Sequence, residues 1–404
     1  MKMPRTYDVV VVGGGIGGLA LGCALTESQR SVLILEARTR ILPSKRGLSL
    51  QANGLEVLQK MGLLERIRKV GVATRHVAWF DLSGELLADL DYSVLNHPNS
   101  YLLTVIPSEL EEILREEFLR RGGELEESTN FKGLTRQRDD VTVTASRNET
   151  SLEFSTKILV GADGQESAVR QSLQFPTKVR ENPDHFLFML ADSVDVIRQD
   201  ARQYFGRGKM IGLFPIHGGT YIFHYIPRGA FNVLIEEGLD QFKAGILRII
   251  PEMHDALGNL RSWNDILHVA PKRIEVRTWV RDRVALLGDA AHALDPSWAQ
   301  GANMTLRDAE ALAEIIEKCF QSGDFTVNKL IEYETMRRKQ TTFIQQQSDR
   351  TARLTATENR VNLWAGKRII RNIGANRDLM RISLRASAGL TDHFSMREQL
   401  RFLL

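Results

Sequence analysis

Gly13, Gly15 and Gly18 stand at the spacing G-x-G-x-x-G, directly after an apolar run and directly before a second apolar stretch. In such a turn the first glycine permits a tight bend, the second lets a pyrophosphate approach the backbone, and the third lets a helix pack on a strand. Glu36 follows 21 residues after Gly15. A carboxylate at that place can accept hydrogen bonds from both hydroxyls of a ribose. The pattern therefore predicts a site for an ADP-containing dinucleotide, and it does not separate NAD from FAD.

A second motif joins an apolar segment to an aspartate–glycine pair. Within residues 157–170 the apolar run ends at Gly161, and Asp163 and Gly164 follow as a turn signal. The residues from Ser167 onward begin another element. Taken alone, this pattern is as typical of a polar connection between a strand and a helix as of a ligand-binding loop.

A third motif, in residues 283–313, places Gly288 and Asp289 after an apolar segment and before a loop rich in alanine and glycine. The carboxylate of Asp289 could bind the hydroxyls of a polyol chain. Small residues such as Gly301 and Ala302 would let backbone N–H groups approach a planar ring and stabilise negative charge on it. An ordinary loop between a strand and a helix is the alternative for this stretch taken alone.

The elements that must position these motifs follow an α/β pattern. Residues 7–12 and 31–35 read as buried strands on either side of a helix over 16–28, which is one βαβ unit. Residues 108–121 form an amphipathic helical pattern with one apolar face. From about residue 173 to 280 the pattern changes to strands with alternating apolar residues. We therefore predict an α/β fold into which a β-rich domain is inserted.

The same changes of pattern suggest domain boundaries. We assign residues 1–75, 100–172 and 273–340 to a discontinuous nucleotide-binding domain, residues 76–99 and 173–272 to a substrate-binding domain, and residues 341–404 to a C-terminal helical segment.

The composition is that of an ordinary globular protein. The 404 residues include 53 Lys and Arg against 50 Asp and Glu, and 43% of them are hydrophobic. The near balance of charge argues against a nucleic-acid binder. Cys23 and Cys319 are too few for a disulfide framework, and no uninterrupted apolar run is long enough to cross a bilayer. The glycine density near the N-terminus disfavours a signal peptide, so we expect a cytoplasmic protein.

The three motifs, in this order and spacing, resemble those of the class A flavoprotein aromatic hydroxylases, the single-component FAD monooxygenases that include 4-hydroxybenzoate hydroxylase. The resemblance covers residues 7–340, although the middle third matches only in its general pattern of strands and not in motifs. It implies a Rossmann-type FAD-binding domain interrupted by a β-sheet substrate domain. The residues that it places around FAD are Gly13, Gly15, Ile16, Gly18, Glu36, Ala37, Arg46, Gly47, Asp163, Gly164, Gly288, Asp289, Pro296, Gly301, Ala302 and Asn303.

Two departures from the family pattern are visible. Pro107 stands where the family usually has an arginine before the amphipathic helix, so one expected pyrophosphate contact is missing or comes from elsewhere. Ala299 stands where the family often has glycine, which is a tolerable change to another small residue. Trp298 beside it either walls the substrate pocket or is an ordinary packed aromatic residue.

The resemblance also implies a reaction. NADH or NADPH reduces the bound FAD, O₂ adds to it as a flavin C4a-hydroperoxide, and a hydroxyl group passes to an aromatic or polycyclic small molecule. We expect no metal site. His217, His224 and Tyr225 are weak candidates for a base that would deprotonate a phenol, with Tyr221 as a rival. For His292 we favour a structural role near the flavin loop.

Three other functions are weighed against this one. A flavin-dependent halogenase would carry a W-x-W-x-I-P motif, and a geranylgeranyl-reductase-type flavoprotein would carry Y-x-W-x-F-P; the sequence contains neither. A non-catalytic FAD-binding module is a different class, and the complete set of flavin motifs argues against it.

The charge is unevenly distributed. From Arg337 to the end, 14 Lys and Arg residues stand against 5 Asp and Glu, a local charge of +9. This segment mixes apolar and basic residues, and an amphipathic helix touching a membrane surface is one interpretation. We favour the other, a helix packed on the FAD domain with a solvated basic face. We expect a monomer or a homodimer that binds a small aromatic or lipophilic substrate.

Overall fold

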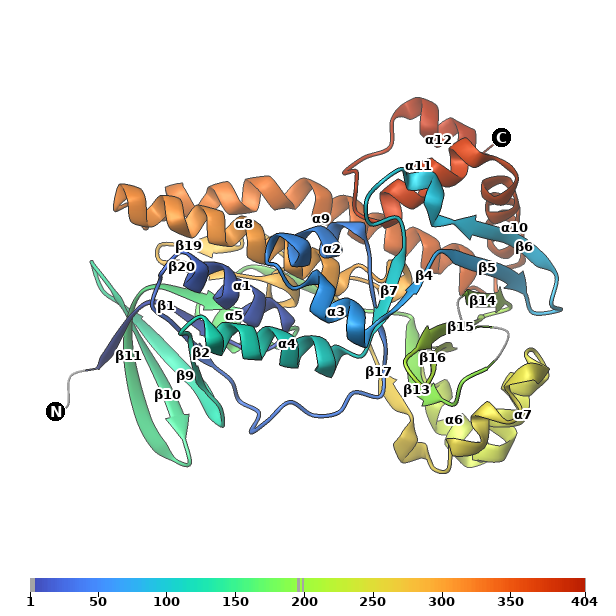
Figure 1. Ribbon diagram of the computed structural model, residues 1–404, viewed down its shortest axis with the longest axis horizontal. Coiled ribbons are helices and arrows are strands. Elements are labelled where there is room, and N and C mark those ends of the chain that lie inside the picture. The colour runs from blue at the N-terminus through green and yellow to red at the C-terminus, as the bar shows by residue number, and fades with distance from the viewer. Residues whose placement is uncertain (1–3, 195–196, 198–199, 404) are drawn as a thin grey trace.

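The computed structural model describes residues 4–194, 197 and 200–403. Figure 1 shows an elongated molecule with the first sheet at one end and a second sheet, with the C-terminal helices, at the other. Helices α8 (Gly301–Ser322) and α9 (Val327–Thr355) run along the top and connect the two ends.

The first sheet has the parallel core that the sequence predicts. Its strand order is β19-β20-β11-β1-β2-β8, with β10 and β9 continuing from β11. Strands β1, β2, β8, β11 and β20 pair in parallel, and β9, β10 and β19 are antiparallel additions. The strands are β1 (Arg5–Val12), β2 (Val32–Leu35), β8 (Glu124–Glu126), β9 (Thr129–Arg136), β10 (Val141–Arg147), β11 (Thr150–Gly161), β19 (Val280–Arg281) and β20 (Val284–Leu286).

Strand β11 is longer than the sequence analysis indicates. The apolar run that ends at Gly161 indicates only a short strand, whereas β11 spans Thr150–Gly161. Its first half belongs to an antiparallel hairpin with β10, in which side chains alternate between buried and exposed positions. Only the last residues are buried on both faces, so only they form the continuous apolar run that marks a central parallel strand.

A layer of helices covers one face of this sheet. In this layer α1 packs between α4 and α8, and α2 packs on α8. Short pieces complete the layer, including a small three-stranded sheet. These elements are α1 (Ile16–Glu27), α2 (Ala52–Lys60), α3 (Leu64–Val70), α4 (Pro107–Arg120), α5 (Ala168–Ser172), β3 (Leu48–Leu50), β4 (Val72–Thr74) and β7 (Leu102–Val105).

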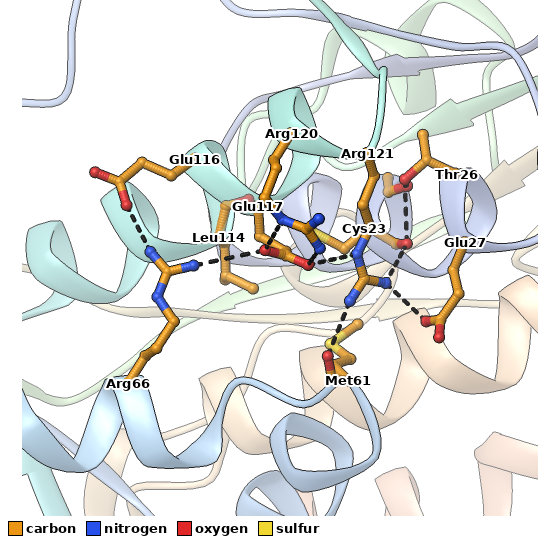
Figure 2. A network of polar contacts seen from close by, with 11 residues as sticks. Cys23, Thr26, Glu27, Met61, Arg66, Leu114, Glu116, Glu117, Arg120 and Arg121 are labelled. Carbon is orange, nitrogen blue, oxygen red and sulfur yellow. Dashed lines mark hydrogen bonds and ion pairs between the residues drawn. The ribbon is translucent and has the colours of Figure 1, made fainter.

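A buried polar network, drawn in Figure 2, fastens α4 to its neighbours. Glu117 on α4 is 5% exposed and accepts hydrogen bonds from Arg120 and Arg121, both at 2.6 Å. Arg121 also donates to the carbonyl oxygens of Cys23 in α1 and Met61 after α2, at 3.0 and 2.9 Å. These contacts hold α1, α4 and the connection between α2 and α3 together, which fixes the last turn of α4 beside α1.

The second sheet has seven strands in the order β17-β13-β16-β15-β14-β5-β6. One face packs on α6 and α7 through an aliphatic cluster, and the other turns toward the first sheet and the C-terminal helices. A separate two-stranded ribbon joins β12 to β18. The elements are β5 (His76–Asp81), β6 (Leu86–Asp91), β12 (Thr177–Glu181), β13 (Asp184–Ala191), β14 (Ala201–Gly206), β15 (Lys209–Ile216), β16 (Gly219–Pro227), β17 (Leu267–Val269), β18 (Lys272–Val276), α6 (Ala230–Glu237) and α7 (Leu239–Leu247).

The C-terminal part is helical, with α10 (Arg360–Ala375), α11 (Arg377–Ser387) and α12 (Met396–Leu403) after α9. Helix α9 is continuous through residue 340, so the boundary that we drew there falls inside a helix. Helix α10 packs against α9 and β6. Across the described ranges of the chain, no helix combines the length and the apolar character needed to span a membrane.

Candidate cofactor and substrate site

The glycine turn between β1 and α1 depends on missing side chains at two places. Gly13 has a φ of +108°, and a Cβ atom on it would lie 2.4 Å from the carbonyl oxygen of Ala162. A Cβ atom on Gly18 would lie 1.9 Å from the carbonyl oxygen of Gly13. Around Gly15, the N-cap of α1, a Cβ atom would meet only the Glu111 carboxylate, at 4.0 Å. The turn is therefore closely packed at Gly13 and Gly18 and open at Gly15, where the N–H groups of α1 point.

Glu36 stands at the end of β2, beside the glycine turn. Its carboxylate accepts hydrogen bonds from the backbone N–H of Gly14 at 2.7 Å, the backbone N–H of Arg38 at 2.8 Å and Arg38 Nε at 3.0 Å. Burial alone would raise the pKa of Glu36, but these hydrogen bonds outweigh it and lower the pKa. Glu36 is therefore ionised at neutral pH and remains an acceptor at the edge of the turn. Ala37 follows on the surface.

Two arginines lie near the place where Pro107 replaces the family's arginine. Arg38 Nη1 donates to Glu111 on α4 at 3.1 Å. Arg38 and Arg46 line one cleft together with Pro107 and Glu111. Burial raises the pKa of Glu111, and the positive charge of Arg38 opposes that effect. Cationic groups are thus present beside the turn although Pro107 supplies none.

One large cavity, about 1590 Å³ including its open side, brings the three motifs together. Its lining includes the aromatic face of the second sheet, with Phe186, Phe188, Phe214 and Tyr221. Of the residues predicted to surround FAD, those that line it are Gly15, Ile16, Arg46, Gly47, Gly164, Asp289, Pro296, Gly301 and Ala302. Those that do not line it are Gly13, Gly18, Glu36, Ala37, Asp163, Gly288 and Asn303.

The two predicted aspartates differ in their surroundings. Asp163 accepts the backbone N–H of Val169 at 3.1 Å, at the start of α5, and burial raises its pKa. Asp289 lines the cavity and accepts from Gln165 Nε2 at 3.3 Å, and burial raises its pKa as well. Asp163 therefore holds the local backbone, whereas Asp289 presents its carboxylate to the cavity.

The side-chain amide of Asn303 fixes the loop over residues 296–303. Asn303 accepts from the backbone N–H of Gln51 at 2.8 Å and donates to the carbonyl oxygens of Ser49 and Ala299 at 3.0 and 2.8 Å. Ala299 has a φ of +50°, which bends the loop into α8. Nothing lies within 4 Å of a Cβ atom built on Gly301, the first residue of α8. The N-terminus of a long helix therefore opens onto the cavity.

The position of each residue in the second sheet decides which candidate base can reach the cavity. His217 lies in the exposed turn between β15 and β16, and it lines neither this cavity nor a neighbouring one described below. His224 lies on β16 but packs against Phe242 of α7, with ring centroids 5.8 Å apart. Burial lowers the pKa of His224 to about 3. Since side chains alternate across a strand, Tyr225 takes the opposite face and lines the cavity.

Tyr225 belongs to a buried polar cluster that sequence reasoning missed. Its hydroxyl lies 2.6 Å from Ser297 Oγ and donates to Asp295 at 3.3 Å. Asn182 donates to the other oxygen of Asp295 at 2.6 Å. Burial raises the pKa of Asp295 to about 6 and, together with the negative charge of Asp295, raises the pKa of Tyr225 far above its ordinary value. The signal in the sequence that could have revealed this cluster is Asp295, which stands directly before the predicted flavin loop.

A second buried group lies behind the loop. His292 Nε2 is 2.6 Å from Asp308 Oδ2 on α8, and Arg337 Nε on α9 donates to Asp308 Oδ1 at 2.7 Å. All three side chains are less than a tenth exposed. Burial alone would raise the pKa of Asp308, but its interactions with His292 and Arg337 outweigh burial and lower it. This triad joins the loop after β20 to both long helices.

Comparison with known proteins agrees with this architecture. A family model described as FAD binding domain matches residues 6–348. The chain is 26% identical over 382 residues to the aurachin C monooxygenase/isomerase of Stigmatella aurantiaca, covering 93% of this chain and 96% of the relative. It is 28% identical over 385 residues to the 3-hydroxybenzoate 6-hydroxylase of Klebsiella oxytoca, covering 90% and 94%.

Solved structures show the same fold. The p-nitrophenol 4-monooxygenase from Pseudomonas putida superposes with a TM-score of 0.81 at 21% identity, covering 96% of this chain and 99% of that one. HpxO of Klebsiella pneumoniae, solved with FAD and uric acid, gives a TM-score of 0.80 at 22% identity, covering 95% and 97%. The predicted fold, a Rossmann-type domain interrupted by a β-sheet domain, is confirmed.

Proposed function

Because this chain belongs to the FAD-binding family of single-component aromatic hydroxylases and is an FAD-dependent monooxygenase, we propose that its large cavity holds both the flavin ring and an aromatic substrate. The observation that carries this proposal is the shared lining. All three motif loops and the aromatic face of the second sheet border one space. A substrate ring lying against Phe186, Phe214 or Tyr221 would therefore face the loop over residues 296–303.

The residues around the cavity fit FAD in size and charge. The open side of Gly15 leaves room for a pyrophosphate at the N-terminus of α1, and the open side of Gly301 leaves room for a planar ring at the N-terminus of α8. Asp289 offers an acceptor for ribityl hydroxyls, and Glu36 offers one for the adenosine ribose. The pyrophosphate contact that the family's arginine makes would come here from Arg38 or Arg46, which lie beside the turn.

Bound FAD supplies the redox chemistry by which NADH or NADPH and O₂ hydroxylate an aromatic ring. The protein contributes binding, orientation and the exclusion of water. The aromatic face of the second sheet surrounds the substrate ring with apolar surface, which keeps water from the reacting atoms. The N-terminal N–H groups of α8 would stabilise negative charge on the planar ring that they approach.

Tyr225 acts in this proposal as a positioning residue. Its hydroxyl is engaged by Ser297 and Asp295, and its raised pKa keeps it a phenol at neutral pH. It therefore holds the loop over residues 296–303 in place rather than accepting a proton from the substrate. His217 and His224 have no path to the cavity, because one is exposed in a turn and the other faces α7.

The experiment that tests the function combines a spectrum with an activity screen. Purified protein should show flavin absorbance, and a panel of phenols, hydroxybenzoates and bicyclic heteroaromatic compounds should stimulate oxidation of NADH or NADPH. Product mass separates hydroxylation from peroxide release without product. FAD-depleted protein, before and after reconstitution, is the control. A flavin-containing protein that oxidises neither nicotinamide with any compound would favour the non-catalytic module instead.

We also propose a cytoplasmic location and a monomeric or homodimeric state. The proposed location follows from the sequence expectation of a reduced chain with two cysteines, both of them free and buried in the structure. Light scattering on the purified holoenzyme measures the assembly directly.

A further inference from the structure

A second cavity, about 990 Å³ including its open side, lies between the second sheet and the C-terminal helices. Aliphatic side chains dominate two of its walls. They are Val77, Leu90 and Leu102 on the strand side, and Ile369, Ile370 and Ile373 on α10. Such a lining offers no charge to a ligand and favours apolar surface by the hydrophobic effect. None of the predicted FAD residues lines this cavity.

This cavity adjoins the proposed flavin and substrate site. Five residues line both spaces, and they are Ser49, Gln203, Phe214, Ser297 and Ala299. Ser297 and Ala299 belong to the loop that we place against the flavin ring. A molecule whose ring lies in front of that loop can therefore extend past Gln203 and Phe214 toward α10.

Buried polar atoms without partners are found around the second cavity. Within the described part of the chain, Trp79 Nε1, Gln203 Oε1 and Gln51 Oε1 make no hydrogen bond. Trp79 and Gln203 are register neighbours on the paired strands β5 and β14, so their side chains lie on the same face of the sheet. A buried donor or acceptor left unpaired costs free energy, so a ligand that pairs with these atoms gains by it.

We propose that the second cavity binds an aliphatic chain carried by the aromatic substrate, and that Trp79 and Gln203 hydrogen-bond polar groups where the ring and the chain meet. The substrate class is then an alkyl-substituted aromatic compound with a carbonyl, hydroxyl or ring N–H group. This inference rests on the proposed function, because it takes the ring to lie in the first cavity. It makes the C-terminal helices a wall that determines substrate specificity.

The two sides of α10 fit this role. Ile369, Ile370 and Ile373 face the cavity, whereas Val361 and Trp364 are 72% and 62% exposed. Lys367 and Arg371 pair with Asp81 and Glu85 at 2.9 and 2.6 Å, which fastens the helix to the β5–β6 hairpin. Helix α10 is therefore held by ion pairs at its outer edge and can present an apolar inner face to an alkyl chain.

The test measures binding along a series of 2-alkylphenols, from 2-methylphenol to 2-nonylphenol, whose hydroxyl group lies beside the attachment of the chain, to the FAD holoenzyme without NADH or NADPH. Perturbation of the flavin spectrum gives the dissociation constant. Affinity should rise by up to about fourfold for each buried methylene group and then level off where the cavity ends. Equal affinity along the series, or no binding by any member, would overturn the proposal.

Two variants locate the effect. Ile370→Trp fills the cavity and should move the plateau to shorter chains while leaving the affinity for 2-methylphenol unchanged. Val361→Trp makes the same kind of change on the exposed side of the same helix and should leave the whole series unchanged. A plateau that does not move in Ile370→Trp, in a protein with unchanged FAD content and melting temperature, contradicts the assignment of the chain to this cavity.

A third variant separates the ring from the chain. Gln203→Leu should weaken every member of the series by about the same factor, of the order of fivefold for one lost hydrogen bond, without altering the gain per methylene. Failure of the proposed function is visible separately. Suppose that the length of the alkyl chain governs binding but that no compound is hydroxylated when NADH or NADPH is added. The binding of an alkyl chain in the second cavity is then supported, and the proposal that these compounds are substrates of the monooxygenase is contradicted.

Discussion

At the residue scale, Asp295 is a buried carboxyl group of the candidate site whose pKa departs from its ordinary value. It lies 3% exposed beneath the loop over residues 296–303 and accepts the backbone N–H of Ser297 at 2.9 Å. Burial raises its pKa to about 6, and the nearby charge of Asp349 acts in the same direction. The carboxyl group is therefore partly protonated just below neutral pH, where an exposed aspartate would be fully ionised.

We predict that Asp295→Asn makes the protein less sensitive to rising pH. Between the unfolded pKa near 4 and the folded pKa near 6, the folded state holds a proton that the unfolded state has lost, so folding stability falls as pH rises through this window. The difference amounts to at most about 3 kcal/mol. The melting temperature of Asp295→Asn minus that of the native protein should therefore be larger at pH 7.5 than at pH 5.

The matched control for that experiment is Asp255→Asn, since Asp255 is fully exposed. The melting temperature of Asp255→Asn, plotted against pH, should run parallel to that of the native protein. Burial, and after it the charge of Asp295, raises the pKa of Asp184 to about 6 as well. In Asp295→Asn the pKa of Asp184 therefore falls, which acts in the same direction as the predicted loss of sensitivity to pH. Parallel curves for Asp295→Asn would show that the proton is held elsewhere in the cluster.

At the element scale, the two turns that open onto the cavity have opposite steric requirements. A Cβ atom on Gly18 would lie 1.9 Å from the backbone oxygen of Gly13, so α1 would have to move away from β1. A Cβ atom on Gly301 would meet no protein atom within 4 Å. The first glycine is thus required by the fold itself, whereas the second is required only if a ligand occupies the space in front of it.

We predict that Gly18→Ala yields little folded protein, and that Gly301→Ala folds normally but retains less FAD. Flavin absorbance per protein and the melting temperature of the FAD-free form are the two measurements. Wild-type melting in Gly18→Ala would refute the steric argument. Full FAD retention in Gly301→Ala would place the flavin ring away from the N-terminus of α8.

Sequence patterns predicted the elements that are locally determined and missed those that depend on distant contacts. The strand over residues 7–12 and the helix over 108–121 follow from apolar periodicity, and the structure has them within two residues. The position of His224 on the face toward α7 could not be predicted, because alternation gives two faces without saying which one is inward. The placement of Ile369 and Ile370 beside the flavin loop depends on helix packing across more than 60 residues of sequence, which no local pattern encodes.

At the scale of the whole molecule, part of the basic C-terminal segment is paired with acidic groups of the rest of the fold. Arg337 pairs with Asp308 at 2.7 Å, and Lys367 and Arg371 pair with Asp81 and Glu85. These ion pairs therefore fasten α9 and α10 to the body and neutralise their cations at those places. The exposed apolar surface on α10 is limited to its first turns, with Val361 and Trp364.

This arrangement leads us to predict that the holoenzyme does not sediment with anionic vesicles at physiological salt. A surface helix binds a bilayer through a continuous apolar face assisted by free basic residues, each contributing about 1 kcal/mol near an anionic surface. The apolar face of α10 is occupied by the cavity wall, and two of its cations are paired. Sedimentation with vesicles containing phosphatidylserine, compared with phosphatidylcholine alone, measures the difference. Binding to the anionic vesicles that is lost in Trp364→Ser would show instead that the first turns of α10 insert into the bilayer, and it would give a lipophilic substrate a direct route to the cavity.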